Sequence, residues 1–153
     1  MSAYQLPLWV WPTALMAICG LAVWRGGDDE RLAAGGNLAG WALSLVLFRA
    51  NSQDTQWNVM VVDSAVLVLY VWLALRSHRY WPLFSAGFVL LLVITHAARA
   101  LDAGVSGWAY LTAARVWSYL ALFAIGYGAW TAPAHARALA DAGEPPPSPR
   151  LSP

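Results

Sequence analysis

One acidic side chain lies inside a long apolar run, and its surroundings decide what chemistry it can do. The run extends from Val59 to Arg76, and Asp63 is the only carboxylate in it. In hydrocarbon, a charged side chain costs about 2.5 to 3.5 kcal/mol on insertion scales. Asp63 therefore needs a partner of opposite charge. Such residues in membrane proteins often mark substrate or proton pathways.

The segments that follow supply candidate partners. If the segments that carry Asp63, His96 and Arg115 are antiparallel helices, reflection about the turns places Asp63 near the depth of His96. A second reflection, about the loop near Ala103, brings Arg115 to within about two residues of the depth of Asp63, or roughly 3 Å of rise. We therefore predict an ion pair between Asp63 and Arg115 within one intramembrane polar cluster. The cluster comprises Asp63, Ser64, His96, Arg99, Tyr110 and Arg115.

Two interpretations of this cluster stay open. In the first, the ion pair only fixes helix register, as buried polar groups can do. The protein is then a non-catalytic accessory, assembly or scaffold component of a membrane complex. In the second, Asp63 and His96 form a proton-relay or substrate site, because imidazole titrates near neutral pH. The protein is then a small transporter or a proton-linked substrate-binding subunit. The sequence favours the first, since the other halves of these helices carry almost no ionisable residues for a through-path.

Cofactor and catalytic motifs are sparse. Met60 and His96 are the one pair at matched depth that suggests axial haem ligands, so haem is a minor alternative to a protein without a cofactor. No zinc motif is present. The letters G-V-S-G at 104–107 match a motif of rhomboid intramembrane proteases, but the only later histidine, His135, follows the last apolar segment. We therefore expect no enzyme.

The overall composition indicates what surrounds these residues. The chain of 153 residues is 59% hydrophobic and 11% charged, whereas soluble proteins have about 25% charged residues. The lipid bilayer is thus the expected partner. The net charge is +1 and the basic residues are scattered, which argues against binding to nucleic acid.

Five windows are long and apolar enough to cross a hydrocarbon core, which takes roughly 20 helical residues. We expect a transmembrane domain over residues 1–132, with spans at about 6–24, 32–48, 57–75, 80–98 and 108–130. Short connections make successive helices antiparallel neighbours. The predicted fold class is therefore all-α, a polytopic membrane helical bundle. Residues 133–153 are rich in proline and are expected to form a largely disordered tail.

Small residues indicate where helices approach closely. Gly36 and Gly40 have the four-residue spacing that allows close packing of membrane helices. The helix that carries these glycines can pack closely against another helix of the same chain or against a helix of a second chain. Other membrane subunits and self-association therefore both stay open as partners.

The arginines orient the bundle. We call the side on which the first span begins side A and the opposite side side B. Side A has only Arg49 and Arg99 near the ends of its spans, while side B collects Arg25, Arg31, Arg76, Arg79, Arg137 and Arg150. The positive-inside rule makes side B cytoplasmic. The N-terminus is thus expected outside and the C-terminus in the cytoplasm.

The region from Asp63 to Trp130 also resembles a group of uncharacterised small integral membrane proteins of alphaproteobacteria. The resemblance is carried by the Arg-Ser-x-Arg turn at 76–79, by Trp81-Pro82 and by Thr95-His96. It implies a bacterial inner-membrane location, and it implies no particular activity.

Overall fold

The computed structural model describes residues 7, 9–47, 56–102 and 104–143. These residues form five helices and, within the described part, no strand. The helices are α1 (Val10–Arg25), α2 (Asp28–Leu47), α3 (Trp57–Arg76), α4 (Trp81–Leu101) and α5 (Gly107–Asp141). The all-helical class predicted from the sequence is confirmed.

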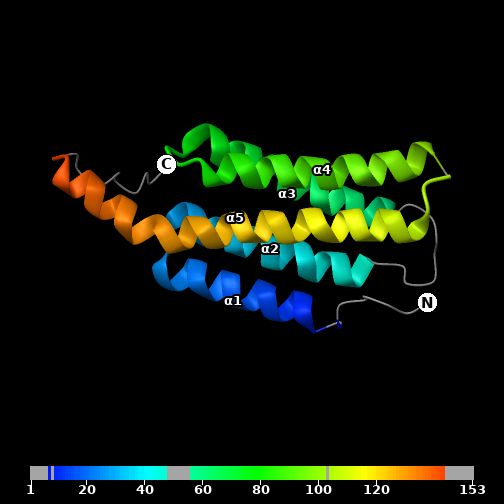
Figure 1. Cartoon of the computed structure of the whole chain (residues 1–153), viewed down its shortest axis with the longest axis horizontal. Coiled ribbons are helices and arrows are strands. Elements are labelled where there is room, and N and C mark those ends of the chain that lie inside the picture. The colour runs from blue at the N-terminus through cyan, green and yellow to red at the C-terminus, as the bar shows by residue number, and fades with distance from the viewer. Residues whose placement is uncertain (1–6, 8, 48–55, 103, 144–153) are drawn as a thin grey trace.

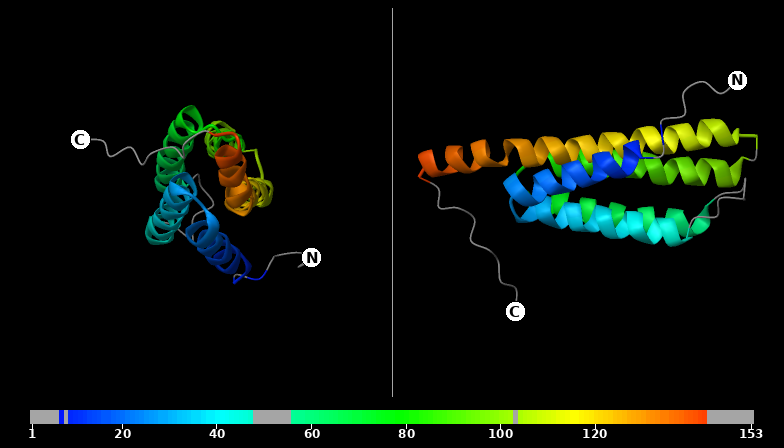
Figure 2. Two further views of the ribbon diagram at one scale, coloured as in Figure 1. Left: turned by 90° about the vertical axis from the view of Figure 1, so that its left-hand side faces the viewer. Right: turned by 90° about the horizontal axis from the view of Figure 1, so that it is seen from below.

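The helices form an up-and-down bundle. Each helix packs against the next one in the sequence, and α5 returns to pack against α1, so that the ring closes. The helices lie side by side along the long axis in Figure 1, and Figure 2 shows the ring end-on. The antiparallel order places the ends of all five helices in two sets, one on side A and one on side B.

Helix α2 begins four residues before its expected start. Its first turn contains Asp28, Asp29 and Glu30, and carboxylates interact favourably with the positive end of a helix dipole. The backbone N–H of Gly27 also donates a hydrogen bond to Glu30 Oε2 at 2.8 Å. A hydropathy profile assigns these acidic residues to a loop, but they form the first turn of this helix. Residues 6 and 48, at the edges of the first two expected spans, lie outside the described residues.

Helix α5 is the longest element and continues well past its expected end at residue 130. Pro133 lies inside it, and the alanine-rich residues that follow have high helix propensity. Arg137 Nε donates a hydrogen bond to the Pro133 carbonyl at 3.2 Å. The last turns of α5 extend beyond the other helices (Figures 1 and 2). The first part of the expected tail is therefore helical, and residues 144–153 lie outside the described residues.

The outside of the bundle is strongly apolar. Large side chains such as Val46, Leu75 and Phe123 point outward, with exposed fractions of 82, 83 and 72%. Three described helices, α3, α4 and α5, are long and apolar enough to cross a membrane. Helix α1 has only 16 residues, and the first turn of α2 is acidic. These features support a membrane location, with three helices as candidate spans.

The interior is tightly packed in the half nearer side B. Tyr70 and Leu73 of α3 and Ile125 of α5 are fully buried there, and Leu15 of α1 is fully buried beside the same core. The half nearer side A contains a cavity with polar side chains on its wall.

Candidate binding cavity

Three side chains from three helices form a hydrogen-bonded chain in the half nearer side A. His96 Nε2 of α4 lies 3.0 Å from Asp63 Oδ2 of α3. The other ring nitrogen, Nδ1, lies 2.7 Å from the hydroxyl of Tyr110 on α5. His96 and Tyr110 are buried, at 3 and 5% exposure, and the side chain of Asp63 is 18% exposed.

The two partners of His96 define one consistent tautomer of the neutral ring. A carboxylate only accepts hydrogen bonds, so Nε2 carries the proton and its N–H donates a hydrogen bond to Asp63 Oδ2. Nδ1 then accepts a hydrogen bond from the hydroxyl of Tyr110. When His96 takes up a second proton, it forms an ion pair with Asp63, and Tyr110 must turn its own proton elsewhere. Both ring nitrogens of His96 thus have a hydrogen-bond partner.

Asp63, His96 and Tyr110 line a partly open cavity of about 330 Å³. Every helix contributes to its wall, with Trp11 from α1, Trp41 from α2 and Leu92 from α4 among the apolar residues. Ligand pockets have volumes of about 300 to 1,000 Å³ and mostly apolar walls with a few polar groups. This cavity is at the small end of that range and has that composition.

Asn37 lies where the cavity meets the packed core. Its Nδ2 donates to the Ala33 carbonyl at 3.1 Å and to the hydroxyl of Tyr70, which is fully buried. This polar pair belongs to α2 and α3. The amide and the phenol satisfy each other here.

Arg115 lies on the cavity wall but is not the partner of Asp63. Asp63 is hydrogen bonded to His96, and Arg115 forms no ion pair or hydrogen bond with another described residue. The matched depth was expected from the sequence. Direct contact also depends on the rotation of α5 about its axis, which a count of residues along the helix does not define.

The remaining members of the predicted cluster lie beside the cavity. The hydroxyl of Ser64 donates to the Met60 carbonyl at 2.7 Å on its own helix. Arg99 donates to the carbonyl of Val105, between α4 and α5. Both side chains therefore serve local structure near the site.

Haem ligation by Met60 and His96 would disturb this arrangement. Both ring nitrogens of His96 already have hydrogen-bond partners, and one of these bonds would have to break to free an iron ligand. Met60 is not among the described residues of the cavity wall. The donor set present here thus does not fit a haem.

Gly36 and Gly40 lie on the face of α2 that packs against α3. A Cβ at Gly40 would lie 2.9 Å from Val66 Cγ2, and one at Gly36 would meet Leu69. Gly40 also lines the cavity. The missing side chains allow α2 and α3 to approach, and at Gly40 they leave space for the cavity.

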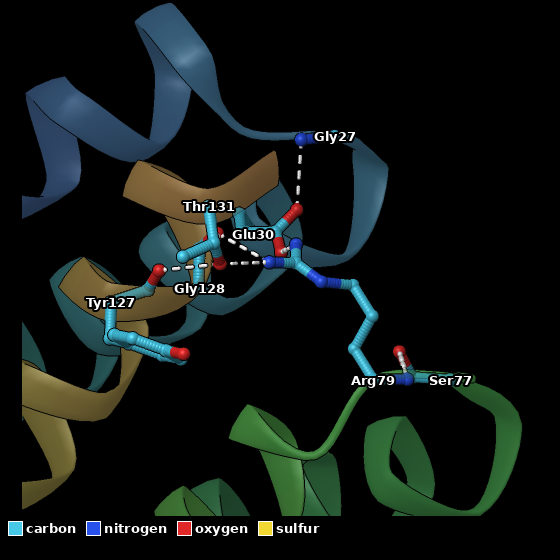
Figure 3. A network of polar contacts seen from close by, with 7 residues as sticks. All are labelled: Gly27, Glu30, Ser77, Arg79, Tyr127, Gly128 and Thr131. Atoms are coloured by element: carbon cyan, nitrogen blue, oxygen red, sulfur yellow. Dashed lines mark hydrogen bonds and ion pairs between the residues drawn. The ribbon is translucent and has the colours of Figure 1, made fainter. Parts of the chain in front are cut away.

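A second polar network lies at side B and was not expected from the sequence. Glu30, at the start of α2, forms an ion pair with Arg79 from the turn between α3 and α4. Arg79 Nη2 also donates to the carbonyl of Gly128 at 2.7 Å and to Thr131 Oγ1 at 2.6 Å on α5 (Figure 3). The side chains of Glu30 and Arg79 are only 3 and 15% exposed. Arg79 thus ties three parts of the bundle together.

More exposed contacts surround this network. Arg76 pairs with Asp29 at 3.1 Å, with side-chain exposures of 45 and 22%. The guanidinium of Arg25 lies 4.5 Å from the centre of the Trp130 ring. The only sequence signal for the buried pair was a carboxylate and an arginine in two turns on the same side of the bundle.

We compared the chain with protein-family models, curated proteins and solved structures, and none of them matches it. The function is therefore inferred from the geometry of the cavity and its polar side chains.

Proposed function

We propose that the chain crosses a bacterial inner membrane five times, with its N-terminus outside and its C-terminus in the cytoplasm. The distribution of arginines supports this orientation, because Arg25, Arg31, Arg76 and Arg79 all lie at side B. The apolar exterior supports the number of spans. Helices α1 and α2 belong to the same closed ring as the three candidate spans α3, α4 and α5, and would share their bilayer.

Within that membrane, we propose that the protein binds a small molecule in its cavity, as a proton-linked binding subunit or small transporter. One observation carries this proposal: Asp63, His96 and Arg115 come from three helices and line the same space of about 330 Å³. If Asp63 and Arg115 served only to fix helix register, they would pair with each other. Instead, Asp63 is hydrogen bonded to His96, and Arg115 lines the cavity without an ion pair or hydrogen bond to another described residue.

Proton linkage follows from the hydrogen-bonded chain. Protonation of His96 would replace a neutral hydrogen bond to Asp63 by an ion pair, which changes the charge of the cavity wall by one unit. A ligand that binds more tightly to one protonation state of His96 shifts the equilibrium toward that state. The size of the shift is set by the difference between the ligand's affinities for the two protonation states.

The packed core argues for a binding site with one entrance and against an open channel. Tyr70, Leu73 and Ile125 are fully buried between the cavity and side B. A ligand that enters from side A meets these side chains. Passage to side B would require the helices to separate.

Ligand-induced stabilisation of the purified protein tests this proposal. We would screen small amphiphiles in detergent micelles by the shift in thermal unfolding midpoint, since a ligand at 100 times its Kd stabilises by about 2.7 kcal/mol. Ala114→Leu narrows the cavity, whereas Ala39→Leu adds the same volume on the exposed face of α2. We expect hits that Ala114→Leu abolishes and Ala39→Leu retains. Hits that survive both variants, or none at all, would contradict the proposal.

The accessory role is the second candidate. A Cβ at Gly20, Gly35 or Gly87 would meet nothing within 4 Å, and glycines on an open helix face allow a second membrane helix to approach. Leucine at each position would block such an approach and leave the bundle intact. Loss of a defined complex in native membranes, with folded monomer retained, would support this role. A complex that is unchanged by all three substitutions would contradict it.

A further inference from the structure

The charges that line the cavity are few and come from only three helices. Helix α3 contributes Asp63, α4 contributes His96, and α5 contributes Tyr110 and Arg115. The described wall residues of α1 and α2 are uncharged. Arg99, one turn from His96 on α4, donates to the carbonyl of Val105. Among the described residues, these four are the ionisable groups on the cavity wall.

Among these groups, only the guanidinium of Arg115 forms no hydrogen bond or ion pair with another described residue. Asp63 and Tyr110 are both hydrogen bonded to His96. Arg115 offers five N–H donors in a planar fork, a geometry that matches a carboxylate or phosphate. Among the described residues, the cavity thus presents a guanidinium with no ion pair or hydrogen bond, beside a carboxylate that is already hydrogen bonded to His96.

The structure also indicates how a molecule reaches Arg115. Helix α1 begins at Val10, and Trp11 packs edge-on against Tyr119 of α5, with ring centroids 5.0 Å apart. Arg115 lies one helical turn from Tyr119 toward the start of α5, beyond the first turn of α1. Figure 1 shows α1 beginning well short of the side A ends of α4 and α5.

We propose that the cavity binds an organic anion, a carboxylate with a small apolar body, whose charged group pairs with Arg115. This inference rests on the proposed binding function and adds the ligand class. The carboxylate would accept two parallel hydrogen bonds from the guanidinium. Its apolar body would lie against Trp11, Trp41 and Leu92.

Charge balance adds a proton to the bound state. With His96 neutral, Asp63 and Arg115 sum to zero, and a bound carboxylate makes the site negative by one unit. Protonation of His96 restores neutrality, and Asp63 is already placed to pair with the imidazolium at 3.0 Å. One carboxylate and one proton should therefore bind together.

Two sources supply this ligand chemistry: fatty acids that enter from the bilayer, and aryl or alkyl acids that enter from water. The test uses purified protein in lipid nanodiscs and isothermal titration with two matched pairs of probes. The first pair is decanoate and decanol, and the second is 3-phenylpropanoate and 3-phenylpropanol. Tighter binding of decanoate points to the bilayer source, and tighter binding of 3-phenylpropanoate points to the aqueous source.

We expect each acid to bind more tightly than its alcohol. Arg115→Gln should weaken the acids roughly ten- to hundred-fold, as expected for loss of a charged hydrogen bond, and leave the alcohols unchanged. Arg115→Lys should retain part of the preference. Arg137→Gln, at an exposed arginine on the same helix, should match the original protein. Titration in buffers of different ionisation enthalpy should give about one proton bound per acid, and none in His96→Gln.

The outcomes separate the ligand class from the binding function. If alcohols bind as tightly as acids, or if Arg115→Gln binds acids normally, the anion site is refuted while ligand binding stands. If no proton accompanies the acid, the co-binding of a proton is refuted. If no probe of either class binds the original protein, the ligand class and the proposed binding function fail together.

Discussion

Removing the charge of Glu30 should destabilise the protein far more than removing the charge of its neighbour Asp29. Both carboxylates lie in the first turn of α2, and both pair with arginines around the same turn. The Glu30 side chain is 3% exposed and that of its partner Arg79 is 15% exposed. The Asp29 and Arg76 side chains are 22 and 45% exposed. The two pairs thus differ mainly in burial.

The expected magnitude follows from that difference. Breaking a buried ion pair by removing one partner costs about 3 to 5 kcal/mol, because the other charge stays buried and uncompensated. Arg79 keeps two acceptors on α5, Gly128 and Thr131, so we expect Glu30→Gln to lie near the lower end, at about 3 kcal/mol. For Asp29→Asn, we expect less than about 1 kcal/mol, as for other exposed pairs.

The assay is equilibrium unfolding in mixed micelles, followed by tryptophan fluorescence. A cycle of Glu30→Gln, Arg79→Gln and the double variant isolates the coupling between the two side chains. The double variant should lose less than the sum of the single losses. Equal effects of Glu30→Gln and Asp29→Asn, or strictly additive losses in the cycle, would refute the reasoning.

Three further predictions concern packing, the polar chain and orientation. Gly128→Ala should lower the free energy of unfolding by about 1 to 3 kcal/mol, because the added Cβ would lie 2.7 Å from the ring of buried Trp81. The control, Gly87→Ala, adds a Cβ that meets nothing within 4 Å and should not change the free energy of unfolding in the same assay. Equal losses in the two variants would contradict this prediction. Asp63→Asn should preserve folded yield on gel filtration and abolish pH-dependent ligand binding, whereas a loss of folded protein would make the pair structural. In a Cys19→Ala background, Ser106→Cys should react with an impermeant thiol reagent added to intact cells, and labelling only after lysis would reverse the proposed orientation.

Much of the fold is predictable from hydropathy alone. The expected third span, 57–75, agrees with α3 to within one residue. The sequence changes abruptly from polar to apolar at Trp57 and from apolar to polar at Arg76. The ends of α2 and α5 were harder to predict. Acidic residues extend α2 toward side B, and an alanine-rich segment continues α5 through Pro133. Hydropathy measures the preference for lipid, whereas these ends depend on capping and helix propensity.

The candidate site was predictable in depth but not in detail. Counting residues from the turns places Asp63, His96 and Arg115 in one layer, and the three side chains do line one cavity. The choice of His96 over Arg115 as the partner of Asp63 depends on how each helix is rotated. The Glu30–Arg79 pair depends on how two turns fold back over α5. Neither rotation nor such folding is encoded in the spacing of residues along one helix.

Native mass spectrometry of the protein extracted directly from its membrane tests the central claim most directly. If the cavity is a ligand site, the original protein should carry a bound species of defined mass that is released on activation. Ala114→Leu should lack that species, and Ala39→Leu should retain it. A mass equal to the bare chain in the original protein, or the same adduct in both variants, would contradict the account.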